Sequence, residues 1–142
     1  MELSRTDRLA GTTLVWLGVD PAGQVGVFSN AGWGPLPADV AGSADVVRAA
    51  LPVLAGLPAI GAAIRTAKSE RDDHYGPWSA RAAAGLWVYQ WEQWGGPYVR
   101  MAAPTVPTNV DHLPLDLQAV ARFATFELSF DHLMALDLHH LA

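Results

Sequence analysis

The chain reads Thr12-Thr-Leu-Val-Trp-Leu-Gly-Val-Asp20, then Pro21-Ala-Gly23, then Val25-Gly-Val-Phe28, and this stretch decides the fold class. β-Branched and aromatic residues fill both runs, and a Pro-Ala-Gly turn separates them, which predicts a β-hairpin. The first run is apolar almost without interruption. It is therefore expected to be a central strand, buried on both faces of the sheet.

A second hairpin is predicted between Leu86–Gln90 and Tyr98–Ala102, because Gln93-Trp-Gly-Gly-Pro97 supplies turn chemistry between two strand-like runs. Side chains alternate along a strand. One face of this hairpin is therefore expected to carry Trp87, Tyr89 and Trp91.

Helices are predicted from apolar residues at helical spacing. The first covers Ala44–Ala55, with Ser43 in the N-cap position and Pro52 expected to kink or restart it. The second covers Ser79–Ala84. A third is capped by Asp111 and includes Pro114 in its first turn.

The remaining segments are ambiguous or irregular. Ala59–Ala67 fits the periods of both a strand and a helix, whereas the charged stretch 68–77 ends in Gly-Pro and is expected to be an exposed loop. At the end of the chain, Phe126–Phe130 suggests a short strand and Asp131–Leu141 a closing helix, with one longer helix as the alternative.

These elements predict one α+β domain covering residues 1–142. The chain has 51% hydrophobic and 16% charged residues, a composition that favours a packed core over disorder. The sheet is expected to be mainly antiparallel, built from the two β-hairpins plus one or two further strands, with the helices packed on one face.

Composition also limits the compartment and the partners. The chain has no cysteine, and its start resembles neither a signal peptide nor a membrane span, so a cytoplasmic location without membrane contact is expected. A net charge of −5 without a basic cluster argues against nucleic acid as a partner. Eight arginines against one lysine, with many alanines, are typical of proteins from GC-rich bacterial genomes.

No motif for catalysis, nucleotide binding or metal binding is recognisable, so no catalytic residue, metal or cofactor is predicted. Gly32-Trp-Gly34 leads into Pro35 instead of the helix that a phosphate site requires. Asp131-His132 and Asp137-Leu-His139-His140 contain metal-ligand residue types. On a closing helix, however, they are interpreted as a solvated helix end, because metal sites normally recruit from several elements.

Tryptophan is the residue type most in excess, with six in a small domain. Trp16 and Trp87 are expected in the core. Tryptophan and tyrosine are enriched at binding hot spots, and several lie here beside Gly or Pro in segments expected to be loops. The predicted contact surface consists of Trp33, Trp78, Trp94 and Tyr75, flanked by Glu70, Asp72 and Asp73.

Two stretches carry a resemblance to known proteins. They are Leu14-Val-Trp-Leu-Gly-Val-Asp-Pro-Ala-Gly-Gln-Val-Gly-Val-Phe28 with Gly34-Pro-Leu-Pro37, and Gly85-Leu-Trp-Val-Tyr89 with Tyr98-Val-Arg-Met-Ala-Ala-Pro104. They resemble small bacterial proteins, some of them similar to immunity proteins of toxin systems. The resemblance implies a non-enzymatic inhibitor that occludes a toxin through an acidic, aromatic face, and complementary charge would accelerate the encounter.

The hypothesis is therefore a protein-binding module, with an immunity-type inhibitor of a toxin as its most concrete form. The alternative is a small-molecule-binding domain or small enzyme with a pocket lined by Trp33, Trp87, Trp91 and His74. A self-associating protein, such as a homodimer, is a third interpretation.

Overall fold

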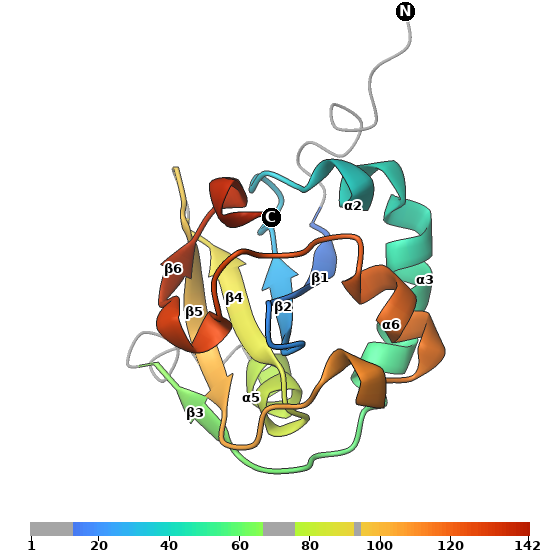
Figure 1. Cartoon of the computed structure of the whole chain (residues 1–142), viewed down its shortest axis with the longest axis vertical. Helices are drawn as coiled ribbons and strands as arrows, with labels where there is room; N and C mark the ends of the chain where they lie inside the picture. The colour runs from blue at the N-terminus through green and yellow to red at the C-terminus, as the bar shows by residue number, and fades with distance from the viewer. Residues whose placement is uncertain (1–12, 67–75, 93–94) are drawn as a thin grey trace, which may run out of the picture.

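The computed structural model describes residues 13–66, 76–92 and 95–142, and it has an α+β fold built on one mixed sheet. The strands run in the order β1-β2-β4-β5-β3, and β6 also pairs with β5 (Figure 1). Their bounds are β1 Val15–Val19, β2 Val25–Ser29, β3 Ala63–Arg65, β4 Trp87–Trp91, β5 Tyr98–Pro104 and β6 Ala135–Leu136.

The sheet is mixed, because one of its strand pairs is parallel and the others are antiparallel. β1 lies at its edge, which corrects the expectation of a central strand, although most of β1 is buried. β1 and β2 pair antiparallel, with Trp16 opposite Phe28, and β4 and β5 also pair antiparallel. Between these two pairs, β2 and β4 run parallel, with Phe28 beside Tyr89. A parallel neighbour requires a crossover connection, and here the chain passes through helices and β3 before it returns as β4.

The helices of the described residues have the bounds α2 Ala38–Gly42, α3 Ala44–Ala55, α5 Gly76–Ala83 and α6 Leu115–Ala121. α3 and α6 pack on each other and on β1, whereas α5 packs on β3, β4 and β5. Pro52 lies inside α3 without ending it. Among the described residues, no helix is long and apolar enough to cross a membrane.

One face of the sheet is aromatic. Trp16 stacks on Phe28 with ring centroids 4.2 Å apart, and Phe28 stacks on Tyr89 at 5.1 Å. Phe126 and Phe130 pack on Phe28 from the end of the chain, at 5.4 and 6.0 Å. The core therefore joins residues that are more than a hundred positions apart.

Residues 123–142 form a strap over this aromatic face, and we call them the C-terminal strap. Thr125 bridges to Val19 in β1, and β6 pairs with β5 near the other edge of the sheet. Figure 1 shows this segment passing in front of β2 and β4 on its way to β6. It contains two 3-10 turns, η2 at Phe130–His132 and η3 at Leu138–His140.

The strand predicted at Phe126–Phe130 and the closing helix at Asp131–Leu141 are therefore wrong. A single helix of that length would span one region of the face, whereas the strap has to reach two strands at opposite sides of it. Its apolar side chains Phe126, Phe130 and Leu136 are buried along that path.

In two other segments the structure decides an ambiguous pattern or differs from the prediction. The ambiguous stretch Ala59–Ala67 contains the short strand β3. Asp111 does not cap the third predicted helix, because Pro114 holds the N-cap position of α6. Asp111 lies instead in the preceding 3-10 turn, where its Oδ1 is 2.8 Å from an Arg122 nitrogen.

Candidate functional site

The loop at residues 30–35, between β2 and α2, is held by the buried side chain of Asn30, and we call it the Trp33 loop. Asn30 Oδ1 accepts hydrogen bonds from Leu14 N at 2.7 Å and from Gly32 N at 3.1 Å. The carbonyl oxygen of Asn30 accepts from Trp33 N at 3.0 Å and from Gly34 N at 2.7 Å. One residue thereby fixes the backbone on both sides of the turn.

The β4–β5 end of the sheet supports the same loop. A Cβ atom at Gly34 would lie 2.7 Å from Cγ of Trp91, so the loop backbone rests directly on that indole. The Pro35 carbonyl accepts a hydrogen bond from the Tyr98 hydroxyl at 2.8 Å. Gly32 takes a φ of +88°, a left-handed conformation that glycine adopts at little cost.

The side chain of Trp33 points away from this support. It is 75% exposed, the second most exposed of the large apolar side chains described. Hydrogen bonds hold the loop backbone below this side chain, so its exposure is a property of the fold. The Trp33 loop presents one indole to solvent in a defined position.

Of the predicted contact residues, the structure describes Trp33 and Trp78, and Trp33 is the exposed one of the two. Trp78 was placed in a loop by its Gly-Pro neighbours, but α5 begins at Gly76, and this turns the side chain into the core, where it is 4% exposed. Trp78 is therefore corrected to a core residue. The remaining predicted contacts lie outside the described residues: Trp94, Tyr75, Glu70, Asp72 and Asp73.

The described tryptophans of the alternative pocket differ in their surroundings. Trp87 is 7% exposed and donates from Nε1 to Gln24 Oε1 at 3.1 Å, while Trp91 is half-buried under the Trp33 loop. His74 lies outside the described residues. A shallow apolar groove occurs elsewhere, between the end of α3 and α5, lined by Leu54, Ala55, Leu57, Pro77, Ala80 and Arg81.

A second polar arrangement, not predicted from the sequence, centres on the buried carboxylate of Asp20 at the end of β1. Its Oδ1 accepts from Ala22 N at 3.0 Å and Gln24 N at 2.8 Å, within the β1–β2 turn. Its Oδ2 accepts from Gln24 Nε2 at 2.9 Å, Ser129 Oγ at 3.1 Å and Phe130 N at 3.0 Å. One carboxylate thereby joins the turn to the C-terminal strap.

Arg100 in β5 and Tyr89 in β4 hold the C-terminal strap through hydrogen bonds. The Arg100 guanidinium lies 4.7 Å from the Trp87 ring centroid and donates from Nη2 to the carbonyls of Phe130 and Leu133, the latter at 2.9 Å. The Tyr89 hydroxyl donates to the Leu133 carbonyl at 2.6 Å. Burial raises the pKa of Tyr89 to about 12.

The role of these groups is structural, because the strap closes over them and their hydrogen bonds are directed at its backbone. The only signal in the sequence was an Asp at the end of a strand before a Pro-Ala-Gly turn. Its partners on the strap follow more than a hundred residues later, and local pattern analysis does not reach across that distance.

Histidine and acidic side chains that could hold a metal ion gather at one place in the described part of the chain. They are Asp137, His139 and His140, whose ligand atoms all lie within 4.8 Å of one another. The closing helix predicted from the sequence would have spaced these residues differently.

Comparison with protein-family models, with curated proteins and with solved structures finds no match to this chain. No functional residue is therefore transferred from a relative. The candidate sites stand on their own geometry.

Proposed function

We propose that this chain is a non-enzymatic protein-binding module and that Trp33 is its principal contact. The observation that carries the proposal is the 75% exposure of Trp33 on a loop that Asn30, Trp91 and Tyr98 hold in place. Tryptophan is the residue type most enriched among the hot spots of protein interfaces.

Covering Trp33 is favourable because its exposed area is large and its loop is already ordered. A tryptophan buries roughly 150–250 Å². With three quarters of that area exposed here, covering Trp33 is worth about 3–5 kcal/mol at about 25 cal/mol per Å², before the costs of association. Ordering a loop on binding reduces affinity. Because the Trp33 loop is already ordered, most of that cost is absent.

Charge indicates the kind of partner. The chain carries a net charge of −5, and Asp39 in α2 is exposed shortly after the Trp33 loop. Complementary charge accelerates association and selects partners, so a basic protein surface suits this face. Together with the resemblance to immunity proteins, this favours a cytoplasmic bacterial inhibitor of a basic toxin as the concrete form of the module.

The test is quantitative affinity capture with the full chain as bait, from the organism that encodes it. Wild type is compared with Trp33→Ala and with the matched control Ile64→Ala. Ile64 is also an exposed large apolar residue, at 58%, but it lies in β3. Figure 1 places β3 at the opposite end of the molecule from α2, into which the Trp33 loop leads.

We expect a basic partner to be recovered by wild type and by Ile64→Ala and to be lost with Trp33→Ala. Equal recovery by all three proteins would contradict the role of Trp33. If folded wild type captures nothing, the binding-module proposal is wrong. Ligand screening against the groove between α3 and α5 and sedimentation at rising concentration would then test the small-molecule and homodimer alternatives.

A further inference from the structure

The end of the C-terminal strap gathers three metal-ligand side chains on a backbone that is fixed from both sides. Asp137 precedes η3, which carries His139 and His140. The His140 carbonyl accepts from Glu127 N at 2.8 Å, and Ala142 N donates to the Thr125 carbonyl at 2.8 Å. The turn therefore pairs with an earlier part of the strap instead of extending freely into solvent.

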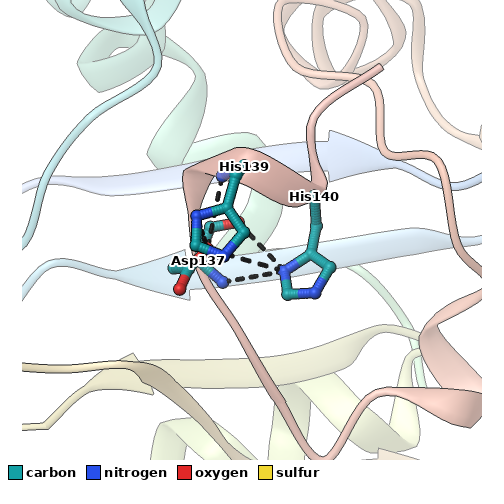
Figure 2. A group of neighbouring side chains, drawn as sticks. All are labelled: Asp137, His139 and His140. Carbon is teal, nitrogen blue, oxygen red and sulfur yellow. Dashed lines mark hydrogen bonds and ion pairs between the residues drawn. The ribbon is translucent and has the colours of Figure 1, made fainter.

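Both imidazoles lie near one carboxylate oxygen, and Nδ1 of His140 accepts a hydrogen bond from Asp137 N at 3.1 Å. Asp137 Oδ1 lies 2.8 Å from Nδ1 of His139 and 3.7 Å from Nδ1 of His140. Figure 2 shows both imidazoles linked to Asp137 on the same side of the turn. The ring centroids of the two histidines are 5.3 Å apart.

This spacing is close to that of a metal site. Zinc binds histidine nitrogen and carboxylate oxygen at about 2.0–2.2 Å, so two ligands of one tetrahedral ion are about 3.3–3.6 Å apart. The ligand atoms here span at most 4.8 Å. Rotation of exposed side chains closes that difference, because the His139 side chain is 81% exposed.

We propose that Asp137, His139 and His140 bind one divalent transition-metal ion of the Zn²⁺ type. Two imidazoles with a single carboxylate suit zinc and its neighbours, whereas Mg²⁺ and Ca²⁺ need oxygen ligands. Three protein ligands leave a coordination position for water or for a group from another molecule. Without metal, Asp137 caps η3 by accepting from His139 N at 3.3 Å. The bound ion would add a cross-link to that turn.

The test is isothermal titration of the full chain, purified without a polyhistidine tag, with ZnCl₂ and separately with MgCl₂. The variants are His139→Gln and His140→Gln. The matched control is His132→Gln, because Nε2 of His132 lies 3.8 Å from Asp131 Oδ1 in a pair that lacks a second imidazole. Circular dichroism checks that each variant is folded.

We expect one Zn²⁺ per chain, no binding of Mg²⁺, and a Tm that rises with Zn²⁺. His139→Gln and His140→Gln should each weaken Zn²⁺ binding by at least about tenfold, since even the outer partners of metal ligands are worth about 10–100-fold. His132→Gln should bind as wild type does. Absence of saturable Zn²⁺ binding, or unchanged affinity in both ligand variants, would overturn the proposal.

Discussion

Replacing Asp20 by asparagine tests how the C-terminal strap is fastened. All five hydrogen-bonding partners of this carboxylate are donors, two at Oδ1 and three at Oδ2. An asparagine amide has one oxygen and one NH₂ group. Either orientation of that amide points its NH₂ group at two or more donors, so the isosteric change removes acceptors that the fold needs.

The size of the effect depends on which donors find another acceptor. The Ser129 hydroxyl can rotate, but the Gln24 amide is held in its orientation because its oxygen accepts from Trp87 Nε1. The backbone N–H of Phe130 is fixed and buried. A hydrogen bond to a charged group contributes about 1.5–3 kcal/mol, and a stranded buried donor costs about 1–3 kcal/mol. We therefore expect Asp20→Asn to lower the free energy of unfolding by about 2–4 kcal/mol.

Urea-induced unfolding followed by tryptophan fluorescence measures this loss, with Asp39→Asn as the matched control at an exposed aspartate. Hydrogen exchange should show the Phe130 amide losing protection in Asp20→Asn before the sheet does. If Asp20→Asn lowers stability by less than about 1 kcal/mol, or leaves the Phe130 amide protected, the carboxylate does not fasten the strap and the reasoning is refuted.

Two further perturbations follow from the packing and the proton equilibria. Gly34→Ala should lower the free energy of unfolding by about 1–3 kcal/mol, because its Cβ would lie 2.7 Å from Trp91 Cγ. Differential scanning calorimetry should show a lower Tm for this variant. The control Gly42→Ala has open space around the new Cβ and should not lower the Tm. Because the pKa of Tyr89 is raised to about 12, the unfolded chain releases this proton first, and stability should fall as pH rises from about 10 to about 12. In alkaline denaturation, Tyr89→Phe should lose stability less steeply between these pH values. At neutral pH it should be about 1 kcal/mol less stable, because the hydrogen bond to the Leu133 carbonyl is lost. An unchanged dependence of stability on pH would contradict the raised pKa of Tyr89.

The local features of the fold were predictable because they depend on neighbouring residues. Alternating β-branched and aromatic residues placed the strands of β1, β2, β4 and β5, and the Gly/Pro/Asn cluster placed Trp33 in a loop. The parallel pairing of β2 with β4 was not predictable in this way, because it depends on where the chain returns after α2, α3, β3 and α5.

The C-terminal strap shows the same limit for side chains. The hydrogen bond from Phe130 N to Asp20 joins residues 110 positions apart, and no periodicity in the sequence reports it. Periodicity also suggested a helix over Asp131–Leu141, whereas contact with two strands of the sheet favours short turns and a two-residue strand. That misplaced helix concealed the grouping of Asp137 with His139 and His140.

The most direct test of the binding proposal is calorimetric titration of the captured partner with wild type, Trp33→Ala and Ile64→Ala. If Trp33 is the principal contact, Trp33→Ala should raise the Kd by at least about 30-fold, which corresponds to a hot-spot loss of about 2 kcal/mol. Ile64→Ala should bind as wild type does. A weakening of less than about fivefold, or about 1 kcal/mol, would contradict the account, because the partner would then bind another face of the molecule.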